Sequence, residues 1–270
     1  MITQRIGIVG AGKMGEALVS GLLNSKSTTI SKLKASDVRR ERRDYVKEAY
    51  GISCYSDNSE LVKESDLLIL AIKPGDMRGV LEQIREGLTI KHLVISIAAG
   101  IRADFISKML PEGVQIIRAM PNNPAMVGEG MTVLAPRANV SKENLQIASE
   151  VFSSIGKVVV LEEKLLDAVT GLSGSGPAYF FLIIDALAEA GVKEGVPREV
   201  AVLLAAQTCV GSGKMVIETG EKPGELIKRI ATPGGTTVKG LAELEKGEVK
   251  SSFIKAVEKA AQRSRELSLR

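Results

Sequence analysis

Two stretches of small residues could bind an anionic ligand through the backbone, one near each end of the 270-residue chain. The first reads Gly10-Ala11-Gly12-Lys13-Met14-Gly15, a Gly-x-Gly-x-x-Gly pattern. The second, Thr232 to Thr237, reads Thr-Pro-Gly-Gly-Thr-Thr and holds no Lys, Arg or His. Because glycine has no Cβ, backbone N–H groups in such stretches can approach a ligand closely.

The first stretch follows the apolar run Ile6–Val9 and opens the helix-like run Glu16–Leu23. In that context the pattern is the fingerprint of a dinucleotide site. The first glycine makes a tight turn, the second admits the pyrophosphate and the third lets helix pack on strand. We expect five residues here to bind the cofactor: Gly10, Gly12, Lys13, Met14 and Gly15.

The choice between NAD and NADP is made at the end of the second strand, where this chain reads Ser36-Asp37-Val38-Arg39-Arg40. An acid directly on the ribose favours NAD, whereas a hydroxyl with nearby arginines favours the 2′-phosphate of NADP. Asp37 therefore argues for NAD, and Ser36 with Arg39 or Arg40 forms a candidate phosphate clamp. We predict that NADPH is preferred and that NAD(H) is also used.

Two more strands end in residues suited to the cofactor. Ala71-Ile72-Lys73-Pro74 and Ala98-Ala99 both follow apolar runs, at the edge where open α/β sheets bind ligands. Small residues there leave room for a nicotinamide ring. For Ala98-Ala99 the alternative is a tight strand-to-helix turn, and both interpretations can hold together.

The second stretch places Thr236 and Thr237 where a helix begins, and a helix N-terminus favours an anion. A plain helix cap after a Pro-Gly turn is the alternative, and the segment alone is more typical of the cap. A third cluster, Thr170–Tyr179, is rich in Gly and Ser and leads into an apolar helix. It is compatible with a capping loop and with close approach of a ligand.

The first half of the chain alternates strands with helices, which predicts a doubly wound, mostly parallel α/β Rossmann sheet over residues 1–162. Two of the strands are apolar throughout, as strands buried on both faces are. The expected strands are Arg5–Gly10, Lys32–Ser36, Ile52–Cys54, Leu67–Ile72, Leu93–Ile97, Gln115–Ala119 and Met131–Ala135. The helices expected among them include Gly15–Ser25, Arg40–Tyr50 and Arg78–Glu86.

The second half, residues 163–270, is predicted to be an all-α domain that binds substrate and dimerises. The run Tyr179–Ile184 is apolar all round, which is typical of a helix buried on every side. So short a domain offers little to cover it, and we expect a partner subunit to do so. The expected helices are Pro177–Gly191, Arg198–Gly220, Pro223–Ile230, Thr237–Lys246 and Ser251–Leu267.

The composition narrows the function classes. Aromatic residues make up 3% with no Trp, and the net charge of +4 is spread out, which argues against nucleic-acid binding. Cys54 and Cys209 lie far apart, so neither a metal site nor a disulfide framework is indicated. The longest apolar stretch, Ala178–Ala190, is short and carries acidic residues, which argues against a membrane span. Because a strand is expected almost at the start, we expect no signal peptide and a cytoplasmic protein.

With these segments in view, the chain resembles the pyrroline-5-carboxylate reductase family from end to end. The segment Ala231–Glu245 is the most specific part of the resemblance. One departure is Asn123, where the family commonly has Thr and which lies close to the expected nicotinamide side. The other matching segments are 10–15, 71–74, 96–100, Arg118–Pro124 and Asp167–Tyr179.

The resemblance implies reduction of 1-pyrroline-5-carboxylate to L-proline by NAD(P)H, the last step of proline biosynthesis. It implies that Thr237 lies beside the imine, that Thr232 helps to hold the carboxylate, and that Glu163 is a substrate-site acid. Asn58 matches a residue near the adenosine ribose. Gly234, Gly235 and Thr236 complete the expected substrate site. Family members are dimers with interleaved helical domains, often assembled into decamers.

Two other functions are compatible with the same general plan. A β-hydroxyacid dehydrogenase also joins a Rossmann domain to a helical one, but it needs a proton carrier and places a lysine a few residues into the helix after its Gly-rich segment. Here the corresponding run, Gly174–Phe181, has no lysine. A non-catalytic NADP-sensing protein would not need to keep the Thr232–Thr237 segment.

Overall fold

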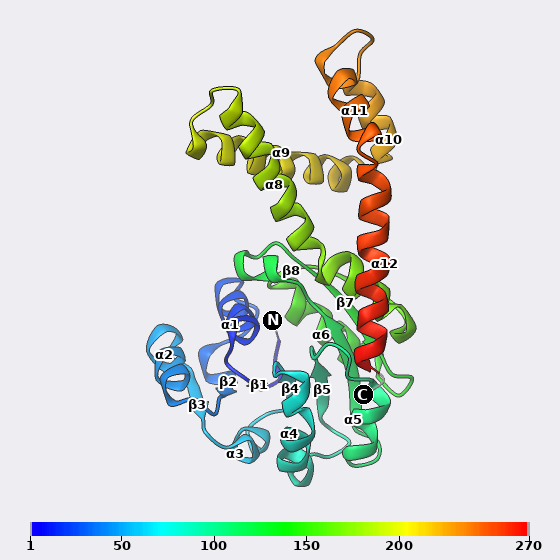
Figure 1. Cartoon of the computed structure of the whole chain (residues 1–270). Helices are drawn as coiled ribbons and strands as arrows, with labels where there is room; N and C mark the ends of the chain where they lie inside the picture. The colour runs from blue at the N-terminus through cyan, green and yellow to red at the C-terminus, as the bar shows by residue number, and fades with distance from the viewer. Residues whose placement is uncertain (1, 269–270) are drawn as a thin grey trace. The chain divides into compact units, whose positions relative to one another are not determined.

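The structure is a computed structural model that describes residues 2–268. Residue 1 and residues 269–270, the outermost residues of the two predicted domains, lie outside the described part. By their contacts, the residues fall into two compact units. One unit contains the chain up to Gly174 and again from Ala260 on, and the other is Ser175–Lys259. Figure 1 shows both, coloured along the chain.

Within the described residues, eight strands form one sheet in the order β3-β2-β1-β4-β5-β6-β7-β8. Every neighbouring pair is parallel except β6 with β7. The predicted doubly wound, mostly parallel sheet is therefore confirmed. The strands are β1 Ile6–Val9, β2 Leu33–Ser36, β3 Ser53–Tyr55, β4 Leu67–Leu70, β5 Leu93–Ser96, β6 Gln115–Met120, β7 Gly130–Pro136 and β8 Gly156–Val160.

The strand order reverses between β1 and β4, which places a crevice at their carboxyl ends. Side chains alternate along the strands, so that Ile6 and Ile8 join one buried core while Val9 joins another. Helices cover both faces. One core packs on α1 Lys13–Asn24, α2 Arg40–Tyr50 and α6 Lys142–Ser153, and the other on α3 Asn58–Lys63, α4 Met77–Ile84 and α5 Ala103–Met109.

Neither β8 nor α6 was expected from the sequence. β8 extends the sheet beyond the antiparallel strand β7, and α6 connects the two strands. β8 lies at the edge of the sheet, and its Val159 and Val160 are 41% and 47% exposed. An edge strand is only half covered by its own sheet, so its apolar pattern is weaker than that of the central strands. The expected strands and helices otherwise match observed ones to within two residues at their ends.

The second unit is helical throughout, in agreement with the predicted all-α half. Its helices are α8 Gly176–Lys193, α9 Arg198–Thr219, α10 Pro223–Ile230, α11 Thr236–Lys246 and most of α12 Val249–Ser268.

The division between the units lies further along the chain than the predicted boundary at 162/163. Leu166 and Val169, on α7 Leu166–Val169, pack against Val133 and Ala135 of β7. This apolar contact holds the start of the predicted helical domain on the sheet, and α12 likewise returns to the sheet unit from Ala260 on.

The glycine- and serine-rich cluster at residues 170–179 is not a capping loop. Thr170–Gly174 forms a π-helical turn that joins α7 to α8 without leaving the helical backbone. The Thr170 hydroxyl donates to the Leu166 carbonyl at 2.8 Å, which ties this turn to the preceding helix. π-helical turns are rare and are found frequently at functional sites.

Large apolar side chains are exposed on α8 and α9 within this single chain. Phe180, Phe181 and Leu182 are 55%, 61% and 68% exposed, and Leu203 and Leu204 are 66% and 56% exposed. Two helical stretches, residues 163–193 and 198–219, are long and apolar enough to cross a membrane by length and composition alone. The helix that contains residues 178–190 is longer than that apolar stretch, and the expected lack of a membrane span stays a prediction.

Candidate functional site

Each of the three glycines in the first stretch has a different geometric role. Gly10 has φ +97°, and a Cβ there would lie 2.5 Å from the Ala71 carbonyl oxygen. A Cβ on Gly15 would collide with the carbonyl of Gly10, so this glycine lets α1 pack against the turn. A Cβ on Gly12 would meet nothing within 4 Å, which leaves an open face beside the backbone. The turn therefore fits a pyrophosphate in the way that its pattern predicts.

A cavity of about 650 Å³ opens beside this turn at the carboxyl ends of β1, β2 and β4. It brings together eight of the predicted cofactor residues: Gly10, Gly12, Ser36, Arg39, Asn58, Ala71, Ile72 and Lys73. Lys13 and Met14 begin α1 next to it, one exposed and one half-buried. With Gly15 they are the first three residues of α1, whose N–H groups have no partner within the helix.

Asp37 and Arg39 line this cavity just after the end of β2. One carboxylate oxygen of Asp37 accepts from the backbone N–H of Ala11 at 3.0 Å, and the other accepts from the backbone and guanidinium of Arg39 at 2.9 and 3.2 Å. Burial favours the neutral form of Asp37, but these hydrogen bonds outweigh it and hold the pKa of its carboxyl below its usual value. Both oxygens are thus committed to the protein, while the Arg39 side chain is 58% exposed.

Ser36 does not present its hydroxyl to a phosphate as the proposed clamp requires. The residue is fully buried, and its Oγ donates to the Asn58 side-chain oxygen at 2.6 Å. The Asn58 amide in turn donates to Gln83 at 2.7 Å. Ser36 therefore orients Asn58, and Arg39 is left as the member of the clamp that faces the cavity. Arg40 is 85% exposed and lies within 3.5 Å of Asp44 on the surface of α2.

The remaining predicted cofactor residues lie around the crevice in different ways. Pro74 and Ala99 line a neighbouring cavity of about 760 Å³, and Gly75 lines both cavities. Ala98 is 4% exposed and packs in the core. For Ala98 the structure favours the tight-turn interpretation, because its side chain faces the protein interior.

Glu163 is placed in the sheet unit, where its carboxylate is engaged. One oxygen accepts from the backbone N–H of Ala103, at the start of α5, at 2.8 Å and from the Arg118 guanidinium at 3.1 Å. Arg118 is 8% exposed, so Glu163 neutralises a nearly buried cation. Contact of Glu163 with a substrate stays a prediction.

The second stretch forms the turn between α10 and α11. Gly234 has φ +76°, and the backbone N–H of Gly235 donates to the Thr232 carbonyl at 2.9 Å. Gly235 is the N-cap of α11 and, among the described residues, no side chain caps that helix start. The first N–H groups of α11, including those of Thr236 and Thr237, have no partner within the helix. The stretch thus combines both interpretations: it is a helix start, and its amides are available.

Several residues at the site were missed by sequence reasoning. Four of them lie on or just before α4 and line the cofactor cavity: Asp76, Gly79, Val80 and Gln83. The sequence could have placed them at the site only because α4 follows Lys73-Pro74, which lies at the edge of the sheet where ligands bind. Arg118 was named only inside a matching segment, and a buried position for it could have been inferred from the apolar residues around it in β6.

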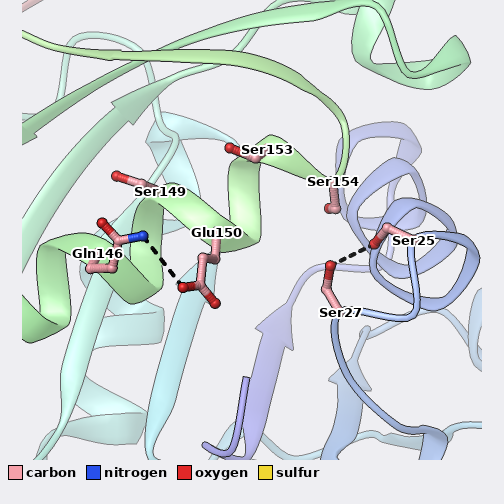
Figure 2. Close-up of a pocket in the computed structure, with 7 residues that line it drawn as sticks. All are labelled: Ser25, Ser27, Gln146, Ser149, Glu150, Ser153 and Ser154. Carbon is pink, nitrogen blue, oxygen red and sulfur yellow. Dashed lines mark hydrogen bonds between the residues drawn. The ribbon is translucent and has the colours of Figure 1, made fainter. Parts of the chain in front are cut away.

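A separate small cavity of about 250 Å³ lies where α1 and α6 end, and Figure 2 shows its lining. It is lined by Ser25, Ser27, Gln146, Ser149, Glu150, Ser153 and Ser154. Several of these side chains are already hydrogen-bonded within the chain, as Ser149 is to the Leu145 carbonyl and Gln146 to Glu150. None of its lining residues is a predicted site residue.

Two family profiles match the chain, one for each half. Residues 163–267 match "Pyrroline-5-carboxylate reductase dimerisation", and residues 5–100 match "NADP oxidoreductase coenzyme F420-dependent". The first covers almost all of the predicted helical half, and the second covers the first hundred residues of the predicted Rossmann half.

Relatives that match along almost the whole chain include several pyrroline-5-carboxylate reductases. The pyrroline-5-carboxylate reductase of Methanosarcina acetivorans is 44% identical over 99% of both chains. Among solved structures, a pyrroline-5-carboxylate reductase from Coxiella burnetii superposes with a TM-score of 0.93 at 34% identity over 99% of both chains. The Plasmodium falciparum pyrroline carboxylate reductase with NADP bound superposes with a TM-score of 0.89 at 32% identity, again over 99% of both chains.

This agreement in sequence and in fold extends from the glycine turn at the start of the chain to the helices at its end. The chain belongs to the pyrroline-5-carboxylate reductase family.

Proposed function

We propose that this protein reduces 1-pyrroline-5-carboxylate to L-proline with NADPH, the last step of proline biosynthesis. The observation that carries the proposal is the start of α11, with uncapped amides and two threonines, in a chain whose other unit holds a dinucleotide cradle. Such a helix start favours a carboxylate. We assign the carboxylate to Thr232, Gly234, Gly235 and Thr236, and the imine to Thr237.

The reaction does not require a side chain of the protein to donate a proton. The imine nitrogen takes a proton from water, and the iminium that forms is a strong hydride acceptor. NADPH supplies the hydride from C4 of its nicotinamide to the imine carbon, which completes an amine. The residues named here bind and orient the substrate, and orientation alone is worth effective molarities of roughly 10⁵ M or more. No histidine is needed, which suits a chain whose one histidine, His92, bonds to Thr89.

The activity is tested with purified protein, NADPH and racemic 1-pyrroline-5-carboxylate, by following nicotinamide absorbance and proline formation together. We expect one proline for each NADPH oxidised. Oxidation of NADPH only with β-hydroxyacid or keto-acid partners would favour a β-hydroxyacid dehydrogenase. Binding of NADPH without turnover would favour a sensor. Pyrroline-2-carboxylate serves as the control substrate because its double bond lies at a different carbon.

NADPH is the preferred cofactor in this proposal, and NADH is used less well. Asp37 is held by Ala11 and Arg39, so its carboxylate is not free to accept from a ribose hydroxyl. Arg39 lines the cavity and carries an exposed guanidinium that suits a 2′-phosphate.

Replacing Arg39 with glutamine is expected to raise KM for NADPH by about ten- to hundredfold, since a hydrogen bond to a charged group contributes about 1.5–3 kcal/mol. KM for NADH should stay close to that of the native protein, because NADH has no 2′-phosphate. Steady-state kinetics with both cofactors measure the ratio. An equal rise in KM for the two cofactors would contradict the assignment.

The exposed apolar faces of α8 and α9 are assigned to contact with a second copy of the chain, in a homodimer that assembles further into a decamer. These faces carry few charged residues, as does the centre of an obligate interface between subunits. We place the protein in the cytoplasm, with no membrane and no nucleic acid as partner.

Light scattering of the native protein should give at least twice the 28.7 kDa of one chain. Phe181→Glu should shift it toward the monomer, because a carboxylate would be buried without a partner. Ile90→Glu is the control, since Ile90 is 64% exposed but lies in the sheet unit. A native monomer, or an unchanged assembly in the Phe181 variant, would count against this use of α8.

A further inference from the structure

The backbone of Ala11, at the centre of the glycine turn, is hydrogen-bonded at both its N–H and its carbonyl. Its N–H donates to the Asp37 carboxylate at 3.0 Å. Its carbonyl accepts two hydrogen bonds from the Arg42 guanidinium, at 2.9 and 2.6 Å. Gly10 and Gly12 line the cofactor cavity, whereas Ala11 between them is 1% exposed and turned inward.

We propose that Arg42 is a positioning residue for the dinucleotide, which acts by keeping the Ala11 carbonyl turned away from the pyrophosphate. The inference rests on the proposed function only in that NAD(P)H is the cofactor. If the Ala11–Gly12 peptide rotated, the Ala11 oxygen would face the phosphate oxygens and repel them. With the carbonyl held, the next N–H groups, at Gly12 and the start of α1, are the groups presented to the phosphates.

Arg42 is itself held by a network on α1 and α2. Its guanidinium donates to Glu16 at 2.7 Å and lies 4.8 Å from the ring centroid of Tyr45. The other oxygen of Glu16 accepts from the Tyr45 and Tyr50 hydroxyls at 2.8 and 3.1 Å. Fixing both the guanidinium and its partner lowers the entropy that Arg42 loses on binding the carbonyl.

The charge of this network is steady near neutral pH. Burial disfavours the ionised form of Glu16, but the hydrogen bonds from Arg42 and the two tyrosines prevail, and its pKa stays below the usual value. Burial, with the bond to Glu16, raises the pKa of Tyr50 to about 12. Glu16 is therefore ionised and Tyr50 neutral across the pH range in which a reductase is assayed, so Arg42 keeps its partner.

The test is binding of both cofactors to Arg42→Lys, which keeps the charge but loses the planar pair of donors. We expect Kd for NADPH and for NADH to rise by the same factor, about tenfold for a loss of about 1.4 kcal/mol. The ratio of the two Kd values should stay as in the native protein, and kcat at saturating cofactor should not change. Lys47→Gln, which removes an exposed cation from the same helix, is the matched control.

Three outcomes would overturn the inference. Native Kd values for both cofactors in Arg42→Lys would show that the turn needs no such support. A changed NADPH-to-NADH ratio would mean that Arg42 contacts the 2′-phosphate directly. A lower Tm with unchanged Kd would mean that it stabilises the fold alone. Binding is read from nicotinamide fluorescence without imine, so failure of the proposed reduction would leave this test standing.

Discussion

Replacing Gly12 with alanine is expected to weaken NADPH binding by at least about hundredfold and to leave the fold almost unchanged. Gly12 has φ −71° and ψ −172°, an extended conformation that alanine adopts freely. A Cβ there would meet nothing within 4 Å in the protein itself. It would instead occupy the space that the second glycine of this pattern leaves for the pyrophosphate.

The size of the effect follows from the contacts that would be lost. Two hydrogen bonds to a charged group, at about 1.5–3 kcal/mol each, correspond to at least about a hundredfold in Kd. The stability cost should not exceed about 1 kcal/mol, the difference between glycine and alanine at an N-cap. Fluorescence titration measures the first and thermal unfolding the second.

Gly15→Ala supplies the contrast. Its Cβ would collide with the carbonyl of Gly10, and both atoms belong to the backbone, so the helix or the turn must move. Overpacking of this kind costs about 1–3 kcal/mol, and Tm should fall by about 2–4 °C for each kcal/mol. If Gly12→Ala bound NADPH normally, the pyrophosphate would lie elsewhere. If it lost as much stability as Gly15→Ala, the space beside Gly12 would not be open in the protein itself.

The difference between these two glycines could be predicted because a local pattern dictates both. The strand before the turn is fully buried, and the helix after it begins at Lys13, so that Gly15 lies in its first turn. The same holds for most of the central sheet, where apolar runs such as Leu67–Leu70 are buried on both faces. A strand buried on both faces requires a continuous run of apolar residues, and the ends of these runs mark the strand ends that lie at the site.

Hydrogen bonds between residues far apart in the sequence are not marked by any such pattern. Ser36 and Asn58 are 22 positions apart, and Arg42 reaches back 31 positions to the Ala11 carbonyl. A sequence places both members at the site without stating which polar atom bonds to which. For this reason Ser36 was assigned to a phosphate clamp, although its hydroxyl is committed to Asn58, and the support given by Arg42 was missed.

The division of the chain into compact units also depends on contacts between residues that are far apart in the sequence. The change from strands to helices at about residue 163 is visible in the sequence, but α7 packs on β7 through Leu166 and Val169. Change of secondary structure and change of compact unit are therefore separate events in this chain. Packing decides the second, and packing depends on which apolar faces meet.

Replacing Thr237 with alanine is expected to lower kcat/KM for 1-pyrroline-5-carboxylate by roughly hundredfold, the cost of removing one preorganised donor at a reacting centre. Kd for NADPH should not change, since the dinucleotide cradle is formed by residues of the other unit. Single-turnover kinetics with saturating NADPH separate the two quantities. Equal turnover in the variant and the native protein would contradict the role of Thr237.

Two further variants decide whether the hydroxyl or the helix start is responsible. Thr237→Ser keeps the hydroxyl and should restore most of the turnover, although serine has more rotamer freedom than β-branched threonine. Thr236→Ala tests the neighbouring hydroxyl, on a residue that is more exposed than Thr237. A loss of turnover in Thr236→Ala with none in Thr237→Ala would exchange the two assignments.

The carboxylate and the imine of the substrate are assigned to different groups at this helix start, so their contributions can be measured separately. The carboxylate is assigned to backbone amides, which survive any change of side chain at Thr237, so KM for the substrate should rise less than kcat falls. An interaction that acts mainly in the transition state lowers kcat, whereas one that acts equally on bound substrate raises KM. A Thr237→Ala variant that raised KM alone would place the hydroxyl on the carboxylate, and the imine would then be oriented by the amides and the cofactor.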